Sequence, residues 1–209
     1  MIQEPNIYSF HDYIAFLKEW MNYLSRCERP LSLRNIARRS GLSPSAISLA
    51  LSRKRRLKER SFEKFLMVLR LKPAQRNYLQ HLYKISEADN AAERIESLRK
   101  IQNIQQYRKT NFKEVQVFNY LSNWLNVVIR EMANLKDFDR DPTSIKKQLN
   151  FLTDLKKIKK SDNFLFNEKL LEEKDGKIVQ GDSQIICDAN VFKLSLLDFH
   201  RQMLSLATE

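Results

Sequence analysis

The sequence contains little glycine and little cysteine, and each shortage excludes a class of function. Its three glycines, Gly41, Gly176 and Gly181, cannot form a Walker A loop or a G-x-G-x-x-G dinucleotide fingerprint. Its two cysteines, Cys27 and Cys187, lie far apart and lack C-x-x-C spacing. We therefore expect no disulfide framework, no zinc site and no bound cofactor.

Material for catalysis is also scarce. The three histidines are scattered along the chain, which leaves little for a histidine-based triad or a metal site. Asp137, Asp139 and Asp141 offer an alternative, a carboxylate-only nuclease site, but their positions fit loop and helix-cap roles better. We expect a protein that is not an enzyme.

Long apolar runs and a secretion signal are absent from the sequence as well. The apolar runs are short, and the first twenty residues lack the basic-then-apolar order of a signal peptide. We expect neither membrane spanning nor export, and a cytoplasmic location.

Positive charge is what the chain has in excess, at a formal net charge of +12. Residues 1–80 hold 16 Lys or Arg against 6 Asp or Glu, whereas the remainder holds 21 against 19. This distribution favours a polyanionic partner that binds the first 80 residues.

Proline, glycine and capping residues predict five helices in residues 1–85. A capping box of Ser9 and Asp12 would open the first helix, which ends near Leu24. The other four are predicted at residues 33–40, 44–51, 61–70 and 73–85.

The rest of the chain predicts a connecting segment and a second domain. Residues 86–108 suit a connecting helix, and residues 109–209 a C-terminal regulatory or dimerisation domain. Within that domain, residues 112–135 predict one central helix, and Asp141 with Pro142 a shorter one.

The second domain is also expected to contain one hairpin and a terminal helix. Asp175 and Gly176 lie between two short segments and predict a type I′ turn. The last twenty residues predict an amphipathic helix, whose apolar face would carry Phe192, Leu196, Phe199 and Met203. The expected fold is mostly α, with a winged-helix-like second domain.

The stretch LRNIARRSGLSPSAISLALSRKRR, residues 33–56, has the spacing of a helix-turn-helix. Ala37 is small where the second helix must cross, Gly41 permits the turn, and the β-branched Ile47 would fix the second helix to the core. Two helices at a steep angle also occur in proteins that never bind DNA. The basic residues around this motif therefore decide in favour of DNA binding.

The second helix of this motif would enter the major groove. Its outward residues are small or apolar and could contact base edges and thymine methyl groups; the predicted base contacts are Ser43, Pro44, Ser45, Ser48 and Leu49. Basic residues flank it and would contact phosphates; the predicted phosphate contacts are Arg34, Arg38, Arg53, Lys54, Arg55, Arg56 and Lys58.

Several stretches resemble a bacterial family of transcriptional regulators with an N-terminal helix-turn-helix of the Cro and lambda-repressor type. In the first half these are LSLRNIARRSGLSPSAIS, RRLKERSFEKFLMVLRLKPAQRNYL and SEADNAAERI. In the second half they are NYLSNWLNVVIREM, FDRDPTSIKKQL and LLEEKDGKIVQGD. The resemblance implies a five-helix repressor-like domain and a C-terminal domain of unknown function, helical and winged-helix-like.

From these observations we expect a dimeric, sequence-specific regulator that binds double-stranded DNA. An effector or a protein partner would act at the C-terminal domain. Two alternatives remain: an adaptor that uses the helix-turn-helix as a scaffold for protein interaction, and a nucleic-acid-processing enzyme. RNA fits the charge but not the motif, because side chains cannot enter the narrow major groove of A-form RNA.

Overall fold

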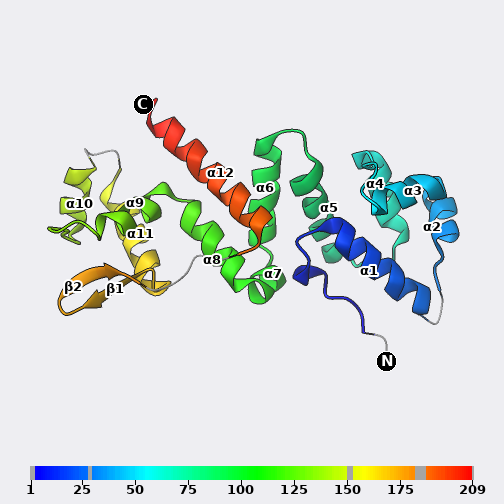
Figure 1. The fold of residues 1–209 in the computed structure, drawn as a ribbon, viewed down its shortest axis with the longest axis horizontal. Helices are drawn as coiled ribbons and strands as arrows, with labels where there is room; N and C mark the ends of the chain where they lie inside the picture. The colour runs from blue at the N-terminus through cyan, green and yellow to red at the C-terminus, as the bar shows by residue number, and fades with distance from the viewer. Residues whose placement is uncertain (1–2, 28–29, 150–152, 182–186, 209) are drawn as a thin grey trace. The chain divides into compact units, whose positions relative to one another are not determined.

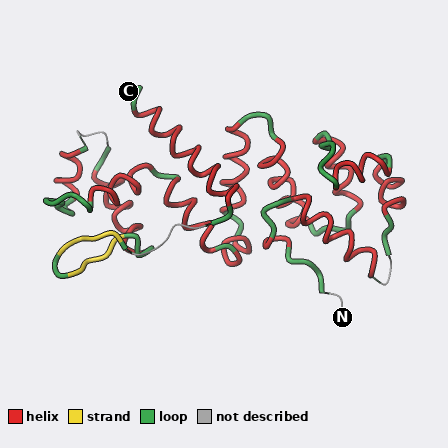
Figure 2. Tube along the Cα trace, in the orientation of Figure 1, coloured by secondary structure: helices red, strands yellow, loops and turns green. Residues whose placement is uncertain are grey.

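The computed structural model describes residues 3–27, 30–149, 153–181 and 187–208. The chain divides into two compact units, Met1–Asn111 and Phe112–Glu209. Both are built from α-helices, and the second also carries a two-stranded antiparallel hairpin (Figures 1 and 2). The predicted fold class, mostly α with one hairpin, is confirmed.

In its described residues the first unit contains the five predicted helices, two further α-helices and a 3₁₀ turn. Its elements are η1 (Ile7–Ser9), α1 (Tyr13–Arg26), α2 (Leu33–Ser40), α3 (Pro44–Leu51), α4 (Glu59–Val68), α5 (Pro73–Glu87), α6 (Ala91–Gln102) and α7 (Gln105–Thr110). The predicted capping box at the first helix is wrong. Ser9 ends the 3₁₀ turn η1, and Asp12 alone caps α1, accepting a hydrogen bond of 2.7 Å from the Ala15 amide.

The segment 86–108, predicted as one connecting helix, forms α6 and α7, and both belong to the first unit. Helix α6 packs along α5, and α7 packs against η1. Behind α7, the Asn111 side chain donates hydrogen bonds to the carbonyls of Tyr8 and Tyr107. The N-terminal segment and the end of the unit are thereby joined across about a hundred residues of sequence.

Aromatic residues fill much of the core of the first unit. Phe62 stacks on Tyr83 with ring centroids 4.2 Å apart, and the Tyr13 ring meets both edge-on. The buried Trp20 indole donates a hydrogen bond of 2.8 Å to the Leu69 carbonyl. Helices α1, α4 and α5 are therefore held by both apolar packing and directed polar contacts.

The second unit contains α8 (Phe112–Leu121), α9 (Trp124–Met132), α10 (Pro142–Gln148), α11 (Leu155–Asn167), β1 (Leu171–Lys174), β2 (Lys177–Gln180) and α12 (Ala189–Leu206). The single central helix predicted over residues 112–135 is wrong, because the chain breaks between α8 and α9. Asn123 is the N-cap of α9, and its side-chain Nδ2 donates a hydrogen bond to the Ser161 hydroxyl on α11. That distant partner favours the break over a continuous helix.

The packed face of α12 agrees with the prediction only in part. Leu196 and Phe199 pack against the apolar core as predicted, but Phe192 and Met203 are both 37% exposed, and Ser195 and Asp198 are buried. Further along the same face, the Gln202 side chain accepts a hydrogen bond from the Trp124 amide and donates one to the Leu121 carbonyl. Gln202 thus satisfies backbone groups at both sides of the break between α8 and α9.

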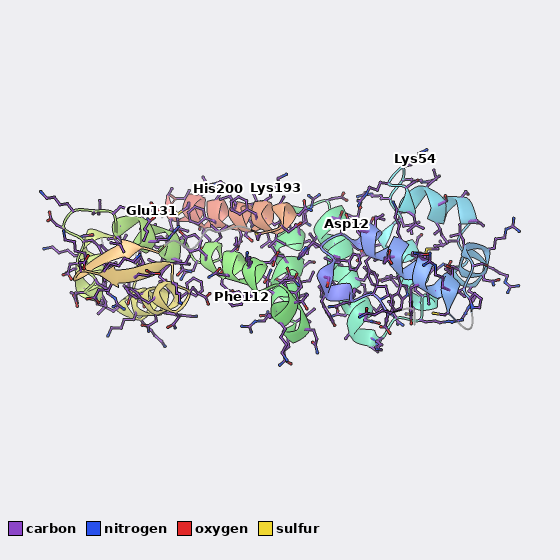
Figure 3. The ribbon with its side chains drawn as sticks, turned by 60° about the horizontal axis from the view of Figure 1, so that its bottom comes forward. Asp12, Lys54, Phe112, Glu131, Lys193 and His200 are labelled. Atoms are coloured by element: carbon purple, nitrogen blue, oxygen red, sulfur yellow. The ribbon has the colours of Figure 1, made fainter. Side chains whose placement is uncertain are left out.

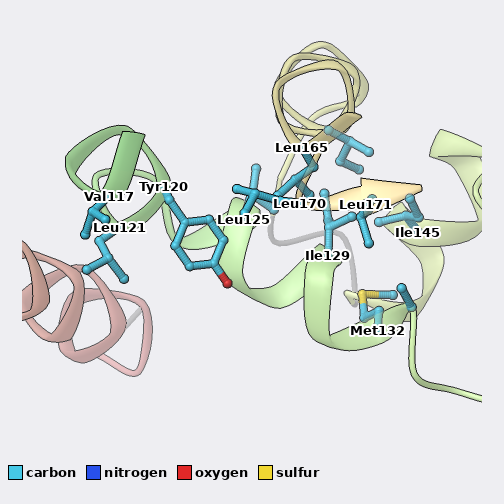
Figure 4. Packing of buried hydrophobic residues seen from close by; sticks show 12 residues of the cluster. Val117, Tyr120, Leu121, Leu125, Ile129, Met132, Ile145, Leu165, Leu170 and Leu171 are labelled. Atoms are coloured by element: carbon cyan, nitrogen blue, oxygen red, sulfur yellow. The ribbon is translucent and has the colours of Figure 1, made fainter. Parts of the chain in front are cut away.

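One apolar cluster links α9, α11 and the hairpin. Ile129 of α9, Leu165 of α11 and Leu171 of β1 belong to it and point toward one another (Figure 4). The hairpin turn is the predicted one, with positive φ at Asp175 and Gly176.

None of the helices in the described part of the chain is both long and apolar enough to cross a membrane.

Candidate nucleic-acid interface

Helices α2 and α3 are joined by a turn of three residues, as the motif spacing predicted. Gly41 ends α2 in the left-handed conformation, with φ +67°, where a side chain would be strained. The Leu42 amide then bonds to the Ala37 carbonyl at 3.1 Å. The turn is closed by backbone bonds, so the direction of α3 is fixed locally.

Serine side chains cap both helices, also as predicted. The Ser32 hydroxyl accepts a hydrogen bond from the Asn35 amide, and the Ser43 hydroxyl accepts one from the Ala46 amide at 3.1 Å. Each cap satisfies one of the amides that the first turn of a helix leaves unpaired.

The two faces of α3 differ sharply. Ile47 is fully buried and Ala50 nearly so, where α3 packs against α1 and α2. The outward face carries all five predicted base-contact residues, and each is exposed: Ser43, Pro44, Ser45, Ser48 and Leu49. Ser43 has a capping role in addition, because its hydroxyl accepts from the Ala46 amide; that hydroxyl also lies 3.1 Å from the Ser45 hydroxyl.

The chain leaves α3 through a tight backbone turn. Arg53 has φ +59°, the Arg53 amide bonds to the Ala50 carbonyl, and the Lys54 amide bonds to the Leu49 carbonyl. This is the Schellman motif, in which glycine normally takes the position that Arg53 holds. The Arg53 guanidinium donates to the Asp12 carboxylate at 2.6 Å, which joins the end of α3 to the start of α1.

Arg56 is likewise engaged within the unit. Its guanidinium donates to the Glu87 carbonyl at 3.0 Å and to the Asp89 carboxylate at 3.1 Å. Hydrogen bonds to Asp12 and to Asp89 raise the pKa of Arg53 and of Arg56, respectively, above the usual value. Arg56 also lines a cavity of about 270 Å³ whose other charged side chains are Lys58, Glu59, Lys84, Glu87, Asp89 and Glu93.

The other five predicted phosphate contacts extend from the surface. Among the described residues, no side-chain hydrogen bond or ion pair involves any of them; they are Arg34, Arg38, Lys54, Arg55 and Lys58. Lys54 lies just past the end of α3 and Asp12 at the start of α1 (Figure 3). Residues 53–58, the basic segment, therefore combine two arginines that bind carboxylates of the same unit with three exposed cations that have no partner among the described residues.

Two residues of this region were not identified from the sequence. Asp12 and Asp89 lie 41 and 33 residues from the arginines that they bind. Local spacing carries no signal for such pairs, although Asp12 was expected to contribute a cap.

Arg53 allows a sharp stability test. We expect Arg53→Ala to be less stable than Arg53→Gly by about 1 kcal/mol, because both lose the ion pair but only glycine adopts the positive φ without strain. Urea unfolding of the two variants measures the difference. Equal stabilities would show that the backbone turn at Arg53 carries no strain.

Comparison with known proteins bears on the second half of the chain. Residues 102–209, just over half of the sequence, match a family described as domain of unknown function DUF4423. The chain belongs to the DUF4423 family. The DUF4423 match begins at the last residue of α6 and takes in α7 and the whole second unit, so α2 and α3 lie outside it. No curated protein and no solved structure is similar enough to match. The match agrees with the C-terminal domain of unknown function that the resemblance implied.

Proposed function

We propose that the protein is a sequence-specific regulator of transcription whose helix α3 enters the major groove of double-stranded DNA. The observation that carries the proposal is the outward face of α3, where small exposed side chains are flanked by cations with no partner among the described residues. Ser45 and Ser48 can donate to or accept from base edges, and Leu49 can contact a thymine methyl group.

The charge distribution over the two units supports this assignment. Residues 1–111 hold 22 Lys or Arg against 10 Asp or Glu, whereas residues 112–209 hold 15 of each. The net positive charge therefore lies in the unit that contains α3. The electrostatic field of this positive charge attracts DNA over distance and supplies the part of the binding affinity that does not depend on DNA sequence.

Contacts within the first unit support a division of the basic residues into two groups. Arg34 and Arg38 lie one turn apart on the exposed face of α2, and Lys54, Arg55 and Lys58 follow α3. We assign phosphate contact to these five side chains. Arg53 and Arg56 act instead as positioning residues, since their guanidinium groups already bind carboxylates of the same unit.

The second unit supplies the remaining parts of the proposal. Helix-turn-helix proteins commonly pair so that two recognition helices read half-sites about one helical turn apart. We assign dimerisation, and response to an effector or protein partner, to the unit that carries the DUF4423 match.

Selection of bound duplexes from a random DNA library at physiological salt tests the proposal. A recovered motif with two half-sites about one turn apart is the expected result. Recovery of no motif with steep salt dependence would contradict sequence specificity. No binding at all would overturn the proposal and favour the adaptor, and strand cleavage with added magnesium would favour the enzyme.

Removal of two exposed cations should weaken DNA binding in a predictable way. We expect Lys54→Ala/Arg55→Ala to lower the slope of log K against log salt by about 2 in magnitude, or about one phosphate contact for each residue. Fluorescence anisotropy over a range of salt concentrations measures the slope. The matched control is Lys18→Ala/Lys109→Ala, which removes the same charge from exposed positions on α1 and α7. Equal slopes for the two variants would show that bulk charge, not this segment, binds phosphate.

A further inference from the structure

Helix α11 of the second unit presents a row of cations on its outward face. Lys156, Lys159, Lys160 and Asn163 are all exposed and follow one another at helical spacing. None of the ion pairs among the described residues involves these three lysines, while the neighbouring Lys157 pairs with Asp154 at 3.7 Å.

The opposite face of α11 fixes this orientation. Ile158 and Leu165 are fully buried in the apolar cluster. The buried Asp162 carboxylate accepts three hydrogen bonds from Arg140 at 2.8–3.1 Å, two from Nε and one from a terminal nitrogen, and the Arg140 guanidinium lies over the Phe166 ring. Because the inner residues pack in the core and bind Arg140, α11 cannot rotate about its axis. Its lysines therefore stay on the surface.

Net charge does not explain this face, because the unit as a whole is neutral in sequence. The charges are instead segregated. Residues 142–167, which span α10 and α11, hold six lysines and two aspartates. Neither aspartate pairs with Lys156, Lys159 or Lys160, because Asp154 is the N-cap of α11 and Asp162 binds Arg140. A cationic strip therefore remains on an otherwise balanced unit.

Neighbouring elements pack against α11 and hold it in place. Helix α11 packs against α9 and α10, and the hairpin follows it directly and packs against its end. The hairpin tip has mixed charge, because Glu173, Asp175 and Lys177 are all exposed there. The lysines on the outward face of α11 therefore make the phosphate contacts, as cations on a helix that borders a groove can do.

From this arrangement we infer that the outward face of α11 is a second binding surface for double-stranded DNA, distinct from α3. Lys156, Lys159 and Lys160 bind phosphate oxygens, and Asn163 reaches a base edge or the backbone. A lipid surface fits less well, because the apolar face of α11 is buried in the core. The inference goes beyond the proposed function, which assigns DNA contact to the first unit alone.

Binding of the full chain to a labelled duplex of about 40 base pairs, roughly four helical turns, tests the surface. The variant is Lys156→Ala/Lys159→Ala/Lys160→Ala, and the control is Lys113→Ala/Lys136→Ala/Lys193→Ala, which removes three exposed lysines elsewhere in the same unit. We expect the α11 variant to lower the salt slope by about 2 to 3, while the control lowers it by well under 1. Circular dichroism checks that both variants remain helical.

The outcomes separate this inference from the proposed function. A second measurement is chemical acetylation of the unaltered chain with and without DNA. A reduced slope for the α11 variant alone, together with slower acetylation of these three lysines when DNA is bound, supports a second surface. An unchanged slope for the α11 variant, or equal changes for the two lysine triples, overturns it. If Lys54→Ala/Arg55→Ala weakens binding and the α11 variant does not, the proposed function stands and this inference fails. If the reverse holds, DNA contact belongs to the second unit and the role of α3 fails.

Discussion

Gly181→Ala is expected to destabilise the second unit strongly while leaving the first unit unchanged. A Cβ built at Gly181 would lie 2.0 Å from the Lys169 carbonyl oxygen, and the Gly181 amide already bonds to the Leu170 carbonyl at 3.0 Å. A backbone atom cannot turn aside as a flexible side chain would. Relief of the clash must separate β2 from the end of α11, which we expect to cost several kcal/mol of a typical 5–15 kcal/mol stability.

Hydrogen exchange followed by mass spectrometry can measure the two units separately in one experiment. We expect loss of protection in α8–α12 of Gly181→Ala and unchanged protection in α1–α7. Gly176→Ala is the matched control, because its Cβ would meet nothing within 4 Å and only its positive φ is strained. It should cost about 1 kcal/mol. Full protection in Gly181→Ala would refute the close approach between Gly181 and Lys169.

Ile47→Ala should produce the second large effect, in the first unit. Ile47 is fully buried on the inner face of α3, so truncation leaves a cavity between α3 and the helices behind it. The expected loss is about 3 kcal/mol, within the range for buried Ile→Ala changes. DNA affinity should fall with it, because α3 is held to the unit by this side chain and by Ala50.

Chemical unfolding and DNA binding of the same variant test this expectation together. Ile47→Val keeps the β-branched shape and should cost about 1 kcal/mol. Ser48→Ala, on the exposed face of α3, should leave stability nearly unchanged while altering sequence preference. If Ile47→Ala retained the stability of the unaltered chain, the assignment of Ile47 as the contact that locks α3 would be wrong.

Features that depend on a few adjacent residues could be predicted from the sequence. Ser32, Ser43 and Asp141 cap their helices as expected, because a cap bonds to an amide two or three residues further on. The hairpin turn at Asp175 and Gly176 is equally local. The spacing of small, turning and β-branched residues likewise located α2 and α3 to the residue.

Features that depend on distant partners could not be predicted. The helix break at Asn123 depends on Ser161, 38 residues further along the chain. The separation of Arg53 and Arg56 from the open cations depends on carboxylates and a carbonyl that lie 31 to 41 residues away. Composition identified the basic segment, but only tertiary structure shows which of its side chains are bound within the unit and which have no partner among the described residues.

The polar inner face of α12 gives this helix an unusual relation to the rest of the second unit. Val191, Leu196 and Phe199 give it apolar contacts, but Ser195 and Asp198 are also buried on this face, and Gln202 holds the helix by hydrogen bonds at the break between α8 and α9. Undocking of a helix held in this way exposes less apolar surface than undocking of an apolar one, so it has a small heat-capacity change and a shallow dependence on urea. Helix α12 should therefore open as a separate cooperative step, at a free energy below that of global unfolding.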